Sequence, residues 1–127
     1  MEKTVAKLFG AVFILVGLLG FVGNPIVGSN GFFMTDAVHN IVHILLGVVL
    51  FVGAKNNPVA TMKIVAVIYL LVAMLGFVMG EGKLLGLVMV NTADNWLHLI
   101  LATVLFAASL AGNSTQAPSI PQQPPAQ

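Results

Sequence analysis

The sequence predicts an all-α membrane protein, a bundle of four transmembrane helices built from two tandem two-helix repeats. Hydrophobic residues make up 58% of the 127 residues, only 7% are charged, and the mean hydropathy is +1.02. A soluble domain carries about 25% charged residues. Five basic and four acidic side chains are too few to cover a soluble protein of this size, so we expect lipid to be the solvent for most of its surface.

Long uncharged stretches between the charged residues give the positions of the four helices. Spanning the hydrocarbon core takes about 20 apolar residues, and about 17 is the practical minimum. Turn residues at 23–25 and 28–31 divide the first stretch. The stretches are apolar on all sides, whereas the helices of a soluble bundle need a polar outer face. We therefore expect helices near residues 5–22, 37–54, 61–79 and 94–111.

The lysines predict how the helices are oriented in the membrane. With four crossings, the segment before the first helix and the segment between the second and third helices lie on the same side. Four lysines lie in or next to these segments, against Lys83 alone on the other side. Because lysine is enriched in cytoplasmic segments, we expect both termini to be cytoplasmic. The four lysines are Lys3, Lys7, Lys55 and Lys63.

Two pairs of similar segments indicate an internal repeat. Residues 15–22 read LVGLLGFV, and residues 71–78, a shift of 56 positions, read LVAMLGFV. At a shift of 55 positions, NIVHILLG at 40–47 corresponds to NWLHLILA at 95–102. Since each unit has two helices, both units cross the membrane in the same sense, and we expect a pseudo-two-fold axis along the membrane normal.

The predicted domain organisation is one membrane domain over residues 1–112, followed by a tail over residues 113–127. The first repeat covers about residues 5–54 and the second about residues 61–111. The tail is uncharged and rich in proline and glutamine, a composition that is typical of disordered segments.

Polar residues inside the predicted spans lie on the second and fourth helices. Asn40 and His43 are three positions apart on the second helix, and Asn95 and His98 repeat them on the fourth. Residues at this spacing share one helix face, and polar groups in lipid are costly unless they are paired. Our first hypothesis is that Asn40 bonds to His98 and Asn95 to His43 across the repeats. Such pairs contribute about 0.6 kcal/mol each. Under this hypothesis the protein is a structural or accessory membrane subunit.

Two alternatives give these side chains a chemical role, whereas the first hypothesis needs no cofactor. At equal depth on helices of the same direction, His43 and His98 could ligate a haem iron or a pigment. His39 lies four positions before His43, a spacing that can bind a metal, with the Asp36 carboxylate as a further ligand or only as a helix N-cap. Asp94 takes the place of His39 in the second repeat. Asp36, His39, Asp94 and His98 could also line a proton or small-solute conduit.

The sequence argues against several classes of function. There is no cysteine, and therefore no disulfide, thiol nucleophile or thiolate metal site. A net charge of +1 without arginine argues against a nucleic-acid partner. No phosphate-binding loop, nucleophile elbow or zinc-protease motif is present, so we expect no enzymatic activity and no catalytic residue. The expected partner is the lipid bilayer, with a homo-oligomer or a larger membrane complex left open.

Three segments resemble an uncharacterised bacterial family. They read FILVGLLGF at 13–21, DAVHNIVHILLG at 36–47 and NTADNWLH at 91–98. The family is one of the "domain of unknown function" families, of small four-helix membrane proteins with Asn-x-x-His motifs in the second and fourth helices. The resemblance covers about residues 5–111. It implies the four-helix fold, a bacterial cell (inner) membrane and a role for Asn40, His43, Asn95 and His98, and it implies no particular activity.

Overall fold

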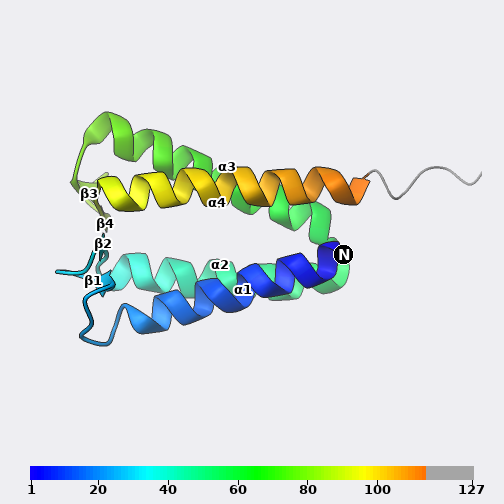
Figure 1. Ribbon diagram of the computed structural model, residues 1–127, viewed down its shortest axis with the longest axis horizontal. Helices are drawn as coiled ribbons and strands as arrows, with labels where there is room; N and C mark the ends of the chain where they lie inside the picture. Colours follow the sequence, from blue (N-terminus) through cyan, green and yellow to red (C-terminus); the bar gives the residue numbers. More distant parts are fainter. Residues whose placement is uncertain (114–127) are drawn as a thin grey trace, which may run out of the picture.

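The computed structural model describes residues 1–113, and this part of the chain contains four helices that run side by side (Figure 1). The all-α fold class predicted from the sequence is therefore confirmed. The predicted disordered tail lies outside the described residues, except for Asn113, which is the last residue of a helix. The helices are α1 (Glu2–Leu19), α2 (Ala37–Asn56), α3 (Pro58–Met79) and α4 (Thr92–Asn113).

Three of these helices are long and apolar enough to cross a membrane: α2, α3 and, within α4, Thr92–Ala111. About a third of each of these spans is buried inside the protein. The remaining surface is largely apolar, as the exposure of Val48, Leu71 and Ile100 illustrates. Helix α1 has 18 residues but carries Glu2, Lys3 and Lys7 in its first two turns. Each of the other three helices carries a single charged residue, so its charge, and not a lower content of apolar residues, distinguishes α1.

Local hydrogen bonds explain where the helices begin and end. Helix α2 begins where expected because the Asp36 carboxylate accepts a hydrogen bond from the His39 backbone N–H at 2.9 Å. Helix α3 begins three residues earlier than expected. The Asn57 side chain caps it, and Pro58, whose fixed φ suits a first turn, follows directly. Helix α1 ends at Leu19 because the Asn24 carboxamide donates to the Leu19 carbonyl at 2.9 Å, which closes the helix into a turn.

Two short strand pairs lie over one end of the bundle, and the sequence analysis did not predict them. Strands β1 (Val27–Gly28) and β2 (Phe33–Met34) pair in parallel, whereas β3 (Gly82–Leu84) and β4 (Val88–Val90) form an antiparallel hairpin. Segments of two or three residues are too short to show an alternating pattern. Gly86 at the turn of the hairpin has a φ of 74°, a conformation that glycine adopts without strain.

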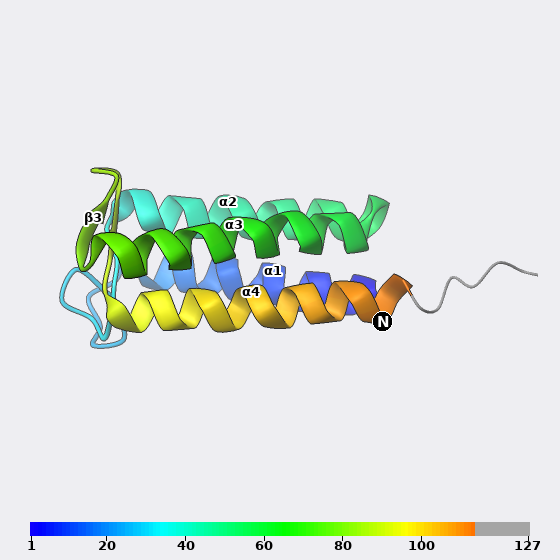
Figure 2. The ribbon, with the colours of Figure 1, turned by 90° about the horizontal axis from the view of Figure 1, so that it is seen from above.

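The helices pack as two pairs, α1 with α2 and α3 with α4 (Figure 1). Seen from above, α3 lies in front of α2 and α4 in front of α1 (Figure 2), and α2 and α3 are in contact between the pairs. Between α1 and α2, Gly10 and Gly47 face one another. A Cβ added to Gly10 would lie 2.9 Å from the Gly47 carbonyl oxygen, and one added to Gly47 would lie 2.7 Å from the Gly10 carbonyl oxygen. Small residues allow membrane helices to approach this closely and to gain van der Waals contact.

The centre of the bundle is divided into two parts along its length. Toward the α2–α3 turn the buried core is apolar and includes Leu50, Met62 and Leu105. Of the eight buried polar residues in the described part of the chain, all except Ser109 lie toward the strand pairs: Thr35, His39, Asn40, His43, Asp94, Asn95 and His98. The candidate site therefore lies in the half of the bundle that is capped by the strands.

Candidate functional site

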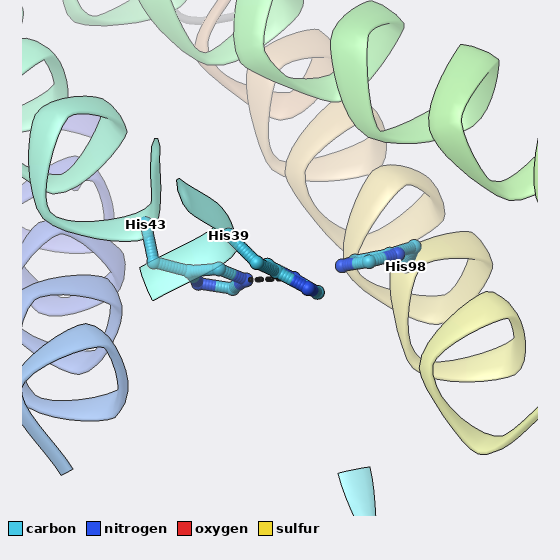
Figure 3. A group of neighbouring side chains, drawn as sticks. All are labelled: His39, His43 and His98. Carbon is cyan, nitrogen blue, oxygen red and sulfur yellow. Dashed lines mark hydrogen bonds between the residues drawn. The ribbon is translucent and has the colours of Figure 1, made fainter. Parts of the chain in front are cut away.

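Three histidines meet in the polar half of the bundle. His39 and His43 come from successive turns of α2, and His98 comes from α4 (Figure 3). All three are buried, and one ring nitrogen from each lies within 4.8 Å of those of the other two. We call His39, His43 and His98 the three-histidine cluster. The sequence predicted that His39 lies beside His43 and that His43 and His98 lie at equal depth, but it did not predict that all three rings meet.

The ring of His39 is held by the β3–β4 hairpin. Its Nδ1 atom lies 2.6 Å from the carbonyl oxygen of Met89 in β4. A carbonyl oxygen only accepts hydrogen bonds, so the His39 Nδ1–H is the donor. In the neutral ring the other nitrogen, Nε2, then carries a free lone pair. Strand β4, which was not predicted from the sequence, therefore determines which nitrogen of His39 faces the cluster.

The ring of His43 has a partner at each nitrogen. Its Nε2 atom lies 3.2 Å from His39 Nε2, and its Nδ1 atom lies 3.3 Å from the Tyr69 hydroxyl of α3. Because His39 Nε2 carries no proton, the His43 Nε2–H donates to it, and His43 Nδ1 accepts from the Tyr69 hydroxyl. A hydroxyl can also accept, so Tyr69 is equally able to bind the other neutral tautomer of His43.

Tyr69 is a site residue that the sequence analysis did not single out. It is the one tyrosine in the chain, and it is buried in the middle of the most apolar helix. Its ring stacks on Phe13 with 4.9 Å between centroids and meets His98 edge-on at 5.0 Å. The isolated hydroxyl in the middle of a long apolar helix was the available signal, since such a group needs a partner in lipid.

His98 completes the cluster and is the least satisfied of the three rings. Its centroid lies 5.6 Å from that of His39 and 6.0 Å from that of His43. Its Nδ1 atom is buried and has no hydrogen-bond partner. A buried ring nitrogen without a partner is uncommon in folded proteins, and it leaves a lone pair or an N–H group available to a ligand.

The predicted hydrogen bonds between asparagines and histidines across the repeats are not formed by these side chains. Both nitrogens of His43 are engaged by His39 and Tyr69 instead, and neither His98 Nδ1 nor the Asn95 side-chain oxygen has a partner. The prediction was wrong because it assumed that residues at equal depth on the second and fourth helices bond to each other. A side chain from the third helix, Tyr69, bonds to His43 instead.

The two asparagines pack within their own helix pairs. The Asn40 carboxamide fills the space over Gly20 at the end of α1, and the Asn95 carboxamide fills the space over Gly76 of α3. A Cβ on either glycine would overlap the facing carboxamide. Asn40 and Asn95 therefore fix how closely the two helices of each pair approach, and they do not join one pair to the other.

The two aspartates named from the sequence have different positions. Asp36 is half-buried at the N-cap of α2 and is not part of the cluster. Asp94 is only 2% exposed. Its carboxylate accepts from the Asn91 backbone N–H at 3.0 Å, while the Asn91 side chain accepts from the Asp94 N–H at 3.0 Å, a reciprocal capping arrangement at the start of α4.

Two cavities adjoin the cluster. One, of about 40 Å³, is lined by the three histidines, Tyr69 and apolar side chains. The other, of about 140 Å³, is lined by His43, His98, Asp94, Thr35 and apolar side chains of α1, α4 and the β1–β2 segment. Thr35 is 3% exposed, and its hydroxyl has no hydrogen-bond partner.

The geometry of the cluster suits a small metal ion. A tetrahedral ion with metal–nitrogen bonds of about 2.0 Å holds its ligand nitrogens about 3.3 Å apart. The Nε2 atoms of His39 and His43 are already 3.2 Å apart. The third ligand atom lies within 4.8 Å of both, so a side-chain shift of about 1–2 Å would bring all three nitrogens into bonding distance of one ion. Imidazole nitrogens are preferred ligands of zinc, copper, nickel and iron.

Fold and site together define a class: small all-α proteins with apolar, membrane-length helices and a buried histidine cluster beneath a strand cap. Residues 3–111 match the family described as Domain of unknown function (DUF4383), and the chain belongs to this family. No match was found among curated proteins or among solved structures.

Proposed function

We propose that the protein is an integral membrane protein with four spans that binds a divalent transition-metal ion at the three-histidine cluster. The observation that carries the metal proposal is the convergence of three buried ring nitrogens within 4.8 Å of one another. Buried polar groups in a membrane protein are costly, and a shared cation gives one nitrogen of each ring a partner at once.

Helix α1 is the fourth span. It packs along α2, and its buried side consists of Ala6, Gly10, Phe13 and Gly17. Leu8, Leu15 and Leu18 on its other faces are exposed, as expected of a surface that meets lipid. Its 18 residues give a length of about 27 Å at 1.5 Å per residue, and its charges lie only in the first two turns, where they reach the membrane surface.

The protein lies in a bacterial inner membrane with both termini in the cytoplasm. The N-terminus, the α2–α3 turn and the end of α4 lie at one end of the bundle, and the strand pairs lie at the other (Figure 1). Four of the five lysines belong to segments at the first end, and Lys83 belongs to β3. The positive-inside rule assigns the lysine-rich end to the cytoplasm.

Single cysteines test this topology, because the natural chain has none. Lys83→Cys should react with a membrane-impermeant maleimide added to intact cells. Lys55→Cys should react only after the membrane is opened. Equal labelling of both variants in intact cells, or the reverse order, would contradict the proposed orientation.

The two helix pairs are tandem copies of one unit. In support, Gly20 receives Asn40 as Gly76 receives Asn95, and a side-chain oxygen of Asp36 caps α2 as one of Asn91 caps α4. Both comparisons match positions 55 or 56 residues apart, the shifts found in the sequence. The largest difference is at His39 and Asp94, where the first copy supplies a metal ligand and the second a carboxylate.

Hydrogen bonds from outside the cluster support ligation by His39 and His43. Metal-binding histidines usually donate their second ring N–H to a carbonyl or another acceptor, which fixes the tautomer and the ring orientation. Here His39 Nδ1 is bonded to the Met89 carbonyl and His43 Nδ1 to the Tyr69 hydroxyl. Both Nε2 atoms are thereby directed toward the proposed ion.

A bare ion fits this site better than a haem or a pigment. Two histidines that ligate one haem iron need a planar macrocycle between their rings. The rings of His43 and His98 instead stack with 6.0 Å between centroids and 30° between planes. The cavity beside them holds about 40 Å³, the volume of one or two water molecules.

The structure supports metal binding better than a proton conduit. The hydrogen-bonded chain from Met89 through His39 and His43 ends at Tyr69. Beyond Tyr69, toward the α2–α3 turn, the described core consists of apolar side chains such as Leu50 and Met62. The buried Ser109 hydroxyl in this half donates to the Phe106 carbonyl of its own helix. A path that carries protons across the whole membrane needs polar groups or water in that half.

Cobalt titration tests the metal proposal. The protein is purified in mild detergent, stripped with a chelator and titrated with Co²⁺, whose tetrahedral complexes absorb visible light strongly. We expect one ion per chain, with binding weakened by His39→Ala, His43→Ala and His98→Ala. Asp36→Asn is the matched control, because it removes a nearby carboxylate, keeps a helix-capping side chain and should bind Co²⁺ like the natural protein. Equal binding by the natural protein and by a variant lacking all three histidines would overturn the proposal.

A further inference from the structure

The cavity of about 140 Å³ beside the cluster is bounded by elements from both helix pairs. His43 and Val16 come from the first pair, Asp94 and His98 come from α4, and Thr35 comes from the segment that follows β2. Two cluster residues, His43 and His98, therefore line this cavity. An engineered cavity of about 150 Å³ in another protein holds benzene, and liquid water takes about 30 Å³ per molecule. The space therefore accommodates about four water molecules or one small ligand.

Most of the cavity wall is apolar, and buried polar atoms with unused hydrogen-bonding capacity belong to residues that line it. The Thr35 hydroxyl and His98 Nδ1 are both buried without a partner. Asp94 is 2% exposed, and no lysine forms an ion pair with it in the part of the chain that the structure describes. Unpaired polar groups of this kind are rare in protein interiors unless a water molecule or a ligand binds them.

Coordination chemistry connects this cavity to the cluster. Metal ions held by three protein ligands usually keep a fourth, open position that a water molecule or a substrate occupies, whereas structural zinc sites have four protein ligands. The cluster supplies three ligands. We propose that the metal ion keeps one exchangeable position directed into the 140 Å³ cavity, where a water molecule or a small anion binds it beside Thr35 and Asp94. This inference rests on the proposed metal-binding function.

In this proposal, the Asp94 carboxylate balances part of the charge of the metal ion. Three neutral imidazoles leave the full +2 charge of a divalent ion, which is costly in a membrane unless a negative group lies nearby. Asp94 is the carboxylate that shares the cavity with His43 and His98. It stabilises the ion and accepts a hydrogen bond from a bound water molecule, and it repels an anion that replaces that water.

Azide titration of the Co²⁺-loaded protein tests the inference, because azide is a three-atom ligand that fits the cavity. We expect a saturable shift of the visible Co²⁺ bands. Thr35→Val should weaken azide binding and leave the Co²⁺ affinity unchanged, since it removes one hydroxyl that is not a ligand. Asp94→Asn keeps the capping oxygen and should change the affinities for Co²⁺ and for azide in opposite directions. It should weaken Co²⁺ binding and strengthen azide binding, each by about tenfold or more.

The outcomes separate the inference from the function on which it rests. If Co²⁺ does not bind, both fail. If Co²⁺ binds at the histidines and its spectrum does not respond to azide, the open position is wrong and the metal site remains. If azide binds and Asp94→Asn changes neither affinity, the open position does not face this cavity, and the inference is overturned.

Discussion

The Nε2 atoms of His39 and His43 lie 3.2 Å apart on successive turns of α2. Two nitrogens this close either share one proton or bind the same cation, since two lone pairs or two N–H groups facing each other repel. Without metal, the His43 Nε2–H donates to His39. If a metal ion bound both Nε2 atoms, as we propose, His43 would carry its proton on Nδ1 and donate it to the Tyr69 hydroxyl.

Tyr69 is expected to set metal affinity without contacting the metal. Its hydroxyl, 3.3 Å from His43 Nδ1, can donate in the metal-free state and accept in the metal-bound state. Removing partners of this kind typically lowers metal affinity about 10–100-fold. We therefore expect Tyr69→Phe to weaken Co²⁺ binding by at least about tenfold, measured by competition with a chelating dye.

Tyr69→Leu is the comparison that separates this effect from packing. Phenylalanine keeps the ring that stacks on Phe13 at 4.9 Å, whereas leucine removes it. Tyr69→Phe should leave thermal stability in detergent nearly unchanged in the metal-free state, and Tyr69→Leu should lower it. If the two variants lose metal affinity and stability in parallel, Tyr69 acts only through packing.

The glycines that face the two asparagines are expected to be intolerant of a methyl group. Gly20→Ala and Gly76→Ala each place a Cβ where the Asn40 or Asn95 carboxamide lies. Overpacking of this kind costs about 1–3 kcal/mol, which thermal or detergent unfolding would detect. Gly23→Ala is the control, because a Cβ there meets no atom within 4 Å. Adding Asn40→Ala to Gly20→Ala should recover part of the loss, and failure to do so would show that the clash is with another group.

Asn91 is expected to stabilise the start of α4 and its link to the strand cap. Its side chain accepts from the Asp94 N–H and donates to the Phe32 carbonyl at 2.9 Å. Loss of an N-cap costs about 1 kcal/mol, so Asn91→Ala should lower the free energy of unfolding by at least that amount. Asn91→Asp keeps the capping oxygen and should retain most of the stability. Equal losses in the two variants would argue against the capping role.

The stability contribution of Glu81 should depend on pH. The Thr92 backbone N–H donates to the Glu81 carboxylate at 3.2 Å and holds the pKa of Glu81 below its ordinary value of 4.5. A lowered pKa in the folded state means that the contribution is complete above pH 4.5 and is lost as the pH falls through the folded-state pKa. Glu81→Ala should therefore be less stable than the natural protein at neutral pH, and the difference should disappear in acid. A difference that persists unchanged at low pH would contradict this assignment.

Much of the fold could be predicted because it depends on solvent and helix period. Apolar stretches of membrane length specify helices whatever their neighbours, since the backbone must satisfy its hydrogen bonds locally in lipid. The pairing of His39 with His43 follows from the same local geometry, since residues four apart share a helix face. The helix ends were predicted less well because they depend on individual caps, such as Asn57 before Pro58.

By itself, then, the sequence determined the all-α fold class, the approximate positions of the helices and the face on which His39 and His43 lie. Only the tertiary structure decided that His98 joins them, that Tyr69 bonds to His43, and that Asn40 and Asn95 pack on glycines within their own helix pairs. It also decided that β4 brings the Met89 carbonyl to His39. The physical reason is that these contacts join different helices. Their formation depends on how the helices rotate and approach one another, and a periodic pattern along one helix carries no information about that.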